Sequence, residues 1–397
     1  GTPVFSTLLP LLFAKTCHFC YTEKTKKRKE DLFVNLPKLS RAISNILQTI
    51  DFSASVPGFR PYPFALYTAS QICIDGACMP YREEFLGNTA IPWQGSYLAI
   101  WNLEDDPVTD PELLSYSLVH EMFHCHQFAN GERRFPSDLA MLTLASEAFY
   151  QMQHEENLAL ADAYTQCDGA AFARFVALRS ARAALQPELF AQQLRTETIE
   201  GMAEYAGLCA LRRINEEKYR KKVAKTCEAL RAESPLLFDA RRICYFSGAL
   251  FFLCLARLGI PLKNDLRSTE SAYAQSIAAF SSANEPCPAP AGRFAVDASA
   301  DIPRAAWIAP ALAALRAARE KTVFDFLQGA VYHPLPSAVC GYDPMHLFRI
   351  EDLVYSDHFV FLQRAGTQLQ LFGPAVLHMR KGDAQHLDGY SVASQRA

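Results

Sequence analysis

The sequence predicts an α+β protein with a helical centre between a strand-bearing N-terminal part and a small C-terminal β module. Apolar residues recur at helical spacing over almost all of residues 109–280. Short apolar runs with turn signals occupy residues 52–103, and similar runs return near the C-terminal end. With 397 residues, 50% of them hydrophobic and 20% charged, the chain can bury a sizeable core.

The N-terminal part, residues 1–108, combines a helix with a small sheet. Apolar residues follow Pro37, which interrupts the pattern, at the spacing of one helix face: Leu39, Ile43, Ile46, Leu47 and Ile50. Strands are expected over residues 64–68, 71–74 and 97–103, and Asp75-Gly76 predicts a hairpin turn. Residues 88–91 are a further strand candidate.

The remaining chain divides into three segments. Residues 109–280 form the helical core, and residues 281–304, rich in Pro, Ala, Ser and Asp, predict a loop or linker. Residues 305–397 hold one helix, to about Gly329, and the β module. In that module a three-residue loop, Ala365-Gly366-Thr367, is expected to join two strands.

Composition excludes several classes of protein. A net charge of −3, from 39 basic and 42 acidic residues, argues against nucleic-acid binding. The longest apolar run, residues 243–258, is interrupted by Ser247, Gly248 and Arg257, so no transmembrane segment is expected. No basic residue precedes the apolar residues 5–14, unlike in a signal peptide. With 12 cysteines that form few close pairs, we expect reduced thiols and a cytoplasmic protein, unless an export signal has been removed.

The sequence His120-Glu121-Met122-Phe123-His124 is an H-E-x-x-H motif. On a helix, positions i and i+4 share a face, so both imidazoles can bind one metal ion. The intervening Glu121 can then act as general base toward a zinc-bound water. Thr109-x-x-Glu112 predicts a capping box at the start of this helix, and Gly131 predicts its end.

A second segment contains a candidate for the third ligand. Residues 196–205 read as a helix in which Glu200 and Glu204 share a face, whereas Glu197 fits a solvated position. The sequence Glu200-Gly201-Met202-Ala203-Glu204-Tyr205 resembles the E-G-x-A-x-Y segment of the aminopeptidase N family, one of the gluzincin metallopeptidases. This resemblance implies a zincin-like core with Glu200 as the third zinc ligand. By similarity to thermolysin-like members, Glu204 orients a ligand histidine.

A third segment, residues 245–250, resembles the Y-x-x-G-A stretch of the same family. The resemblance implies that the Tyr245 hydroxyl stabilises the oxyanion, a role for which Tyr205 is the alternative. Two features differ from the family. Seventy-five residues separate His124 from Glu200, far more than usual, and the G-x-M-E-N segment that anchors a free amino terminus is absent.

Other possible ligands carry less weight. Cys17-His18-Phe19-Cys20 has C-x-x-C spacing without a second such pair, and the basic run at residues 24–29 fits a solvated surface. His126 lies on a different helix face from His124, and His154-Glu155-Glu156 lacks a second histidine. The C-terminal histidines show no ligand spacing and are expected to be structural or surface residues: His333, His346, His358, His378 and His386.

These observations predict a zinc-dependent peptide hydrolase with one Zn²⁺ per chain, held by His120, His124 and Glu200. Its partner is a peptide or protein substrate. Two alternatives remain open. The same zinc site can hydrolyse a substrate that is not a peptide. The chain can also be a non-catalytic helical binding or scaffold protein whose histidines lie in the core.

Overall fold

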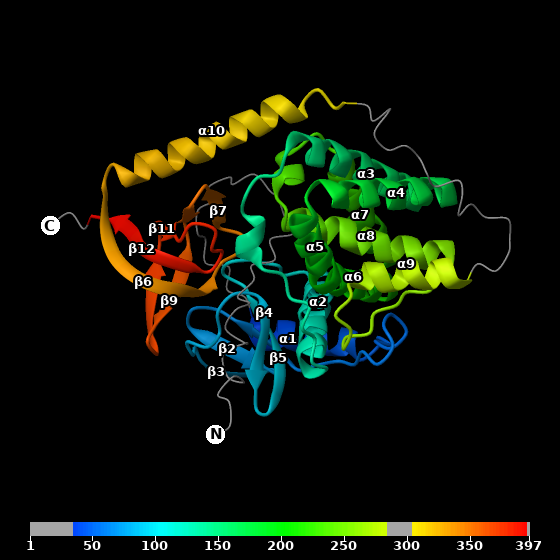
Figure 1. The fold of residues 1–397 in the computed structure, drawn as a ribbon. Coiled ribbons are helices and arrows are strands. Elements are labelled where there is room, and N and C mark those ends of the chain that lie inside the picture. The colour runs from blue at the N-terminus through cyan, green and yellow to red at the C-terminus, as the bar shows by residue number, and fades with distance from the viewer. Residues whose placement is uncertain (1–34, 284–303, 395–397) are drawn as a thin grey trace, which may run out of the picture. The chain divides into compact units, whose positions relative to one another are not determined.

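The computed structural model describes residues 35–283 and 304–394, and these residues confirm the α+β class (Figure 1). They divide into two compact units. One comprises the described residues up to Glu132 together with Ala203–Lys222, and the other comprises Arg133–Met202 together with the described residues from Val223 onward. The segment boundaries predicted from the sequence remain predictions. The C-x-x-C motif, the basic run at residues 24–29 and most of the predicted linker lie outside the described residues.

The first unit contains a five-stranded sheet with the strand order β3-β2-β1-β5-β4. β1 and β5 are parallel, and the other neighbouring strands are antiparallel. Helices α1 and α2 pack on this sheet. The bounds are α1 (Leu36–Leu47), β1 (Phe64–Tyr67), β2 (Gln71–Ile74), β3 (Ala77–Pro80), β4 (Thr89–Trp93), β5 (Ser96–Asn102), α2 (Pro111–Ala129) and α6 (Met202–Ile214). Helix α7 (Glu216–Arg231) belongs to this unit up to Lys222 and to the second unit from Val223.

Turn residues explain the local geometry of this sheet. Asp75 and Gly76, with φ of 48° and 77°, form the predicted two-residue hairpin turn between β2 and β3. Gln94 and Gly95 form a second such turn between β4 and β5. The expectation that Pro37 interrupts the first helix is wrong. Pro37 lies in the first turn of α1, where its missing N–H costs no hydrogen bond.

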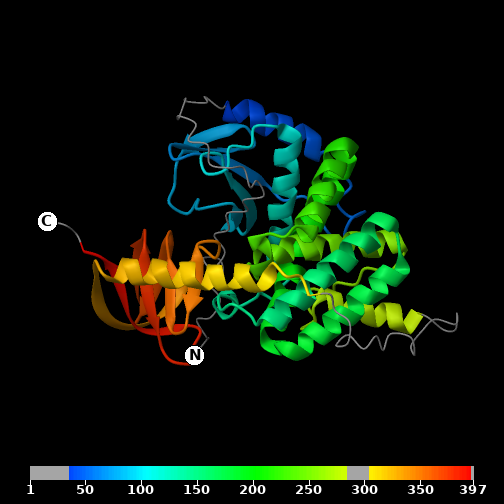
Figure 2. The same cartoon turned by 90° about the horizontal axis from the view of Figure 1, so that it is seen from above.

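The second unit combines a group of helices with a seven-stranded antiparallel sheet, in the order β10-β9-β6-β12-β11-β8-β7 (Figure 2). Its helices are η2 (Asp138–Met141), α3 (Glu147–Gln166), α4 (Gly169–Leu185), α5 (Pro187–Thr196), η3 (Glu197–Gly201), η4 (Pro235–Phe238), α8 (Arg242–Leu258), α9 (Ala272–Ala283) and α10 (Ile308–Leu327). Its strands are β6 (Ala330–Tyr342), β7 (Leu347–Ile350), β8 (Leu353–Ser356), β9 (Phe359–Arg364), β10 (Thr367–Phe372), β11 (Ala375–Met379) and β12 (His386–Ala393).

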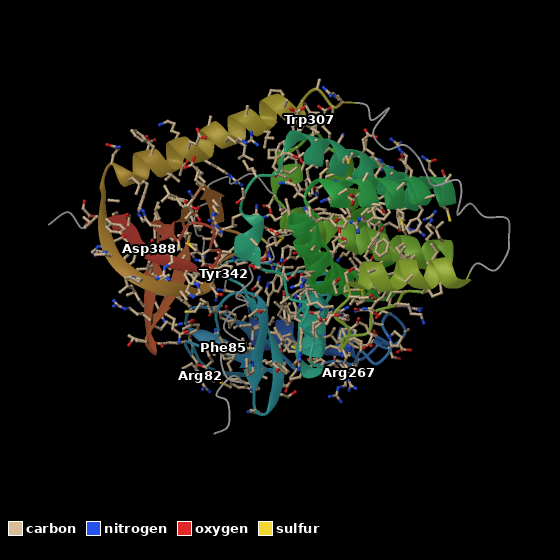
Figure 3. All side chains as sticks on the ribbon, viewed as in Figure 1. Arg82, Phe85, Arg267, Trp307, Tyr342 and Asp388 are labelled. Carbon is tan, nitrogen blue, oxygen red and sulfur yellow. The ribbon has the colours of Figure 1, made fainter. Side chains whose placement is uncertain are left out.

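Helix α10 connects the helices of this unit to its sheet. Trp307 lies at its start (Figure 3). The ring of Trp307 contacts that of Phe238 at a centroid distance of 5.8 Å. Near its end, Phe326 contacts Tyr355 of β8. The predicted three-residue loop between β9 and β10 is wrong, because Thr367 already pairs with Arg364. Ala365 and Gly366 alone form the turn, both with positive φ, as a two-residue hairpin requires.

Across residues 35–283 and 304–394, none of the helices combines the length and the apolar character that crossing a bilayer requires.

Candidate metal centre

Helix α2 carries the H-E-x-x-H motif, as predicted. It begins at Asp110, whose carboxylate accepts hydrogen bonds from the backbone N–H groups of Glu112 and Leu113 at 2.9 and 3.2 Å. Asp110 rather than Thr109 is therefore the N-cap, because a carboxylate satisfies two of the N–H groups that the first turn leaves without a helical acceptor. The helix ends at Asn130, and Gly131 follows with a φ of 77°, as the sequence predicts.

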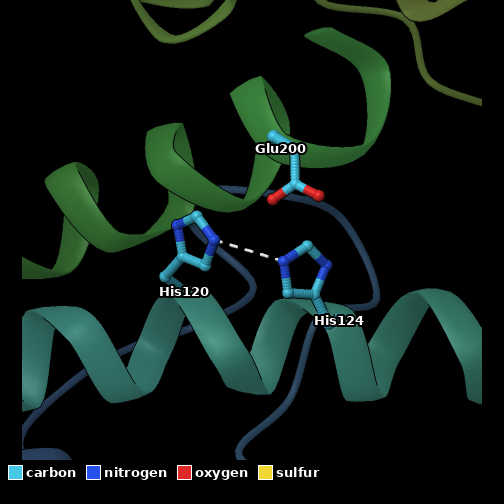
Figure 4. A group of neighbouring side chains, drawn as sticks. All are labelled: His120, His124 and Glu200. Carbon is cyan, nitrogen blue, oxygen red and sulfur yellow. Dashed lines mark hydrogen bonds between the residues drawn. The ribbon is translucent and has the colours of Figure 1, made fainter. Parts of the chain in front are cut away.

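The two histidines of the motif face each other from successive turns of α2. Their Nε2 atoms are 3.2 Å apart, and both side chains are about 2% exposed (Figure 4). Two ligand atoms on one tetrahedral zinc ion, at bond lengths of about 2.0–2.1 Å, lie about 3.3 Å apart. The spacing of these nitrogens therefore fits a pair of ligands of one ion.

Acceptor groups hold the other ring nitrogen of each histidine. Glu204 of α6 lies 3.2 Å from His120 Nδ1 through Oε2, and its Oε1 accepts a hydrogen bond from the Tyr116 hydroxyl. Gln127 Oε1 lies 2.7 Å from His124 Nδ1. Because a carboxylate and an amide oxygen only accept, each Nδ1 carries the proton. With the proton on Nδ1, Nε2 is the nitrogen through which each neutral imidazole can bind a metal ion.

Glu200 completes a group of three. It lies in the π-helical turn η3, which continues into α6 without a break, so Glu200 and Glu204 occupy successive turns of one helical run. The boundary between the two compact units falls inside this run, after Met202. Glu200 is fully buried, and the ligand atoms of His120, His124 and Glu200 lie within 4.8 Å of one another (Figure 4). These three residues form a possible buried metal-binding triad.

An arginine accompanies the carboxylate of Glu200. Arg241 Nη2 donates a hydrogen bond to Glu200 Oε1 at 3.1 Å, and Arg241 also pairs with Asp138. Burial alone would lower the pKa of this arginine, but the charges of Asp138 and Glu200 raise it well above its usual range. Arg241 therefore stays cationic, and it stabilises the ionised form of Glu200 that a metal ion requires.

Two glycines allow the η3 turn to pack closely on helix α8. Gly201 and Gly248 are so close that a Cβ atom on Gly201 would lie 2.7 Å from the Cα atom of Gly248. These glycines belong to the two segments from which Glu200 and Tyr245 were predicted as site residues, residues 200–205 and 245–250. Glycine is needed at both positions because a Cβ atom would clash at this close backbone contact beside Glu200.

A buried ionic network supports the same turn. Arg179 Nη1 and Nη2 bind both carboxylate oxygens of Glu197 at 2.7 and 2.5 Å, and its Nε binds Glu156 at 2.8 Å. Arg182 also binds Glu156, at 2.6 Å, and Ser247 of α8 donates to Glu197 at 2.5 Å. The interpretation of Glu197 as a solvated residue is therefore wrong: it is 3% exposed, because Arg179 compensates its charge.

Glu121 is fully buried on α2, one residue after the first histidine. One turn further along, Cys125 is also buried, and burial followed by the charge of Glu121 raises the pKa of this thiol well above its ordinary value. Cys125 therefore stays protonated at neutral pH. His126 lies against the rings of Phe59 and Phe123, so it is a core residue of the first unit.

The two tyrosines considered for the oxyanion role lie on different helices. Tyr245 lies on α8, 2% exposed, with its ring 6.0 Å from the guanidinium carbon of Arg241. Tyr205 lies on α6, where burial, followed by the nearby thiol of Cys209, raises the pKa of its phenol. Which of the two faces a substrate stays a prediction.

Sequence reasoning did not identify four residues that contact the triad or its immediate partners: Tyr116, Gln127, Asp138 and Arg241. Helical spacing could have suggested two of them, since Tyr116 is four residues before His120 and Gln127 is three residues after His124. Arg241 and Asp138 carry no such signal, because they come from separate parts of the chain. The segment His154-Glu155-Glu156 shows no metal-ligand pattern in the sequence, but Glu156 forms buried ion pairs with Arg179 and Arg182.

Comparison with protein families, with curated proteins and with solved structures finds no match to this chain.

Proposed function

We propose that this chain is a zinc-dependent peptide hydrolase of the gluzincin type, with one zinc ion on His120, His124 and Glu200. The observation that carries the proposal is the donor set. Two buried imidazole nitrogens lie 3.2 Å apart, and a ligand oxygen of a buried carboxylate lies within 4.8 Å of them. Two imidazole nitrogens and one carboxylate oxygen are one of the protein ligand sets of catalytic zinc sites that retain an open position.

The surrounding residues keep these ligands oriented. Glu204 and Gln127 fix the Nδ1-protonated tautomer of each imidazole, and Tyr116 fixes Glu204 in turn. Such partners of a ligand histidine raise its basicity and hold its ring in position. A bound zinc ion supplies Lewis acidity and lowers the pKa of a water molecule at its open position.

Glu121 is the general base in this proposal. Its carboxylate accepts a proton from the attacking water and passes it to the leaving amine nitrogen as the peptide C–N bond breaks. The hydroxyl of Tyr245, or alternatively that of Tyr205, donates a hydrogen bond to the carbonyl oxygen as negative charge develops there.

The sheet of the first unit favours a peptide as the substrate. β4 is an edge strand that is antiparallel to β5, and both strands contact α2, the helix with His120 and His124. An edge strand can bind an extended peptide through backbone hydrogen bonds. Of the strands expected from the sequence, residues 88–91 overlap this edge strand, whereas residues 97–103 overlap the interior strand β5.

Elemental analysis of the full chain, combined with a peptide-library assay, tests this function. We expect about one equivalent of zinc at this site, lost in His120→Ala and Glu200→Ala, and peptide cleavage by the wild-type chain. Glu121→Gln is expected to keep the metal and lose cleavage. Glu112→Gln, a change of the same type on α2 in a half-buried ion pair with Lys218, is the matched control and is expected to keep both.

Each contrary outcome has a definite meaning. Zinc content that is the same in wild type, His120→Ala and Glu200→Ala removes the metal centre and favours the helical binding protein. Zinc that depends on these ligands, with hydrolysis of esters or other acyl compounds but of no peptide, makes the chain a zinc hydrolase of a different substrate class. Full activity in Glu121→Gln removes that residue from the mechanism.

A further inference from the structure

Two turns of the C-terminal sheet lie together and carry three potential metal ligands. The first turn, Asp343–His346, joins β6 to β7, and the second, Asp357–His358, joins β8 to β9. Backbone hydrogen bonds fix the turns to one another and to the strands: Asp357 N–H donates to the His346 carbonyl at 3.2 Å, and Asp343 N–H donates to the Phe359 carbonyl at 3.4 Å. The two turns therefore form one ordered structure.

Asp343 is the central residue of this cluster. Its side chain is 1% exposed, and its Oδ1 accepts a hydrogen bond from the backbone N–H of Met345 at 3.0 Å. The other oxygen, Oδ2, lies 2.6 Å from His358 Nδ1 and 3.9 Å from His346 Nε2. One ligand atom from each of the three residues lies within 4.8 Å of those from the other two.

The hydrogen bond between His346 and Asp357 indicates which ring nitrogen of His346 can bind a metal ion. Asp357 Oδ1 lies 2.7 Å from His346 Nδ1, and because a carboxylate only accepts, that nitrogen carries the proton. In the neutral ring, Nε2 then presents a lone pair to the carboxylate of Asp343. A histidine that binds a metal through one ring nitrogen commonly donates its other ring N–H to a carboxylate, as His346 does to Asp357.

We propose that Asp343, His346 and His358 form a second metal site, which binds a divalent transition metal ion such as zinc or cobalt. Two imidazoles and one carboxylate suit these ions, whereas magnesium and calcium prefer oxygen ligands. The side chains of His346 and His358 are 44% and 53% exposed, so the ion has access from solvent. At His358 Nδ1 the ion competes with the proton now shared with Asp343.

In the sequence, His346 and His358 show no ligand spacing. They are 12 positions apart, on different turns, so no sequence period relates them. The sheet brings them together, with ring centroids 5.3 Å apart. The second site does not depend on the proposed hydrolase function, because its ligands are separate from those of the first.

Titration of the metal-free full chain with Zn²⁺, and with Co²⁺ read by its visible absorption, tests the proposal. The double variant His346→Ala/His358→Ala is expected to bind one ion fewer than the wild type, while His120→Ala still fills the second site. His386→Ala is the matched control, because His386 is also exposed in this sheet and pairs with Asp383 at 3.0 Å in a turn. It is expected to leave the number of bound ions unchanged.

A second variant keeps the test valid if the double variant does not fold. Asp357→Asn removes the carboxylate behind His346 and keeps the shape of the turn, so we expect affinity at this site about 10–100-fold weaker. The proposal is overturned if the double variant binds as many ions as the wild type with the same affinities. It is also overturned if Asp357→Asn binds as tightly as wild type and no ion depends on His346 or His358.

Discussion

Gly201 and Gly248 bring two backbone segments into direct contact, since a Cβ atom on Gly248 would lie 2.9 Å from the Cα atom of Gly201. Real Cβ atoms do not approach other atoms this closely. Glu200 is the residue next to this contact, so the separation of η3 and α8 decides where its carboxylate lies. Substitution of one of these glycines therefore tests whether the backbone contact positions the carboxylate of Glu200.

Gly248→Ala is expected to destabilise the protein by about 1–3 kcal/mol, because the added methyl group overpacks a contact between backbones that cannot rotate away. It is also expected to weaken zinc binding through displacement of Glu200. Urea denaturation measures the first effect, and competition with a chelator measures the second.

Gly169→Ala is the matched control for this substitution. Gly169 lies at the start of α4, with open space around its added Cβ position, and alanine favours helix formation over glycine. We expect it to be neutral or slightly stabilising. Equal losses in the two variants would contradict a special role for the contact between η3 and α8.

The buried network around Glu197 predicts a large loss of stability when one partner is removed. Glu197→Ala leaves the fully buried guanidinium of Arg179 with an incompletely compensated charge, so we expect a loss of about 3–5 kcal/mol. Arg174→Ala is the control, because Arg174 lies on α4, like Arg179, and pairs with a glutamate, Glu155 of α3, but is 50% exposed. That change is expected to cost about 1 kcal/mol or less in urea denaturation. Similar losses of stability in Glu197→Ala and Arg174→Ala would show that burial does not distinguish the two ion pairs.

Stability is expected to fall in acid because of Glu156. Burial alone would raise the pKa of this carboxyl, but the charges of Arg182 and Arg179 lower it below its ordinary value of 4.5. A lowered folded-state pKa gives stability that is present above the unfolded-state pKa and is lost as the pH falls through the folded-state pKa. The free energy of unfolding, measured from pH 7 down to pH 3, should therefore decrease for the wild type.

Glu156→Gln removes the titrating group and separates its effect from that of other carboxyls. We expect the variant to be less stable at pH 7 and to lose less stability between pH 5 and pH 3. Curves for wild type and variant that run parallel over this range would contradict the assignment to Glu156.

Local patterns predicted those parts of the fold and site that depend on neighbours in sequence. Helical period and turn residues identified α2 and the Asp75-Gly76 hairpin, and the i, i+4 rule placed His120 beside His124. The position of Glu200 relative to this pair was inferred only from a resemblance, because 75 residues separate it from His124.

Long-range contacts explain what the sequence could not predict. The sequence predicts a solvated position for Glu197, because its ionic partner, Arg179, lies 18 positions earlier on another helix. Arg241 reaches Glu200 across 41 positions, and Asp343 meets His358 across 15. Such pairs have no period in the sequence, since tertiary packing alone determines which helices and turns meet.

Glu204 and Tyr116 are expected to act on metal affinity through His120. Glu204→Gln replaces the carboxylate that holds Nδ1 with a weaker acceptor, and Tyr116→Phe removes the hydroxyl that holds Glu204. We expect zinc affinity to fall by about 10–100-fold in Glu204→Gln and by less in Tyr116→Phe. Tyr97→Phe, which keeps the ring stacked on Phe128 of α2, is the control and is expected to bind zinc normally.

Tyr245 and Tyr205 are distinguished by removing one hydroxyl at a time, which changes turnover without changing the metal ligands. Loss of one oxyanion donor typically lowers kcat about 10²–10³-fold, so Tyr245→Phe should show this loss with normal zinc content, and Tyr205→Phe should not. A little-changed KM would place the lost interaction in the transition state rather than in substrate binding. The reverse pattern assigns the donor to Tyr205 on α6, and normal kcat in both variants excludes both tyrosines from the oxyanion role.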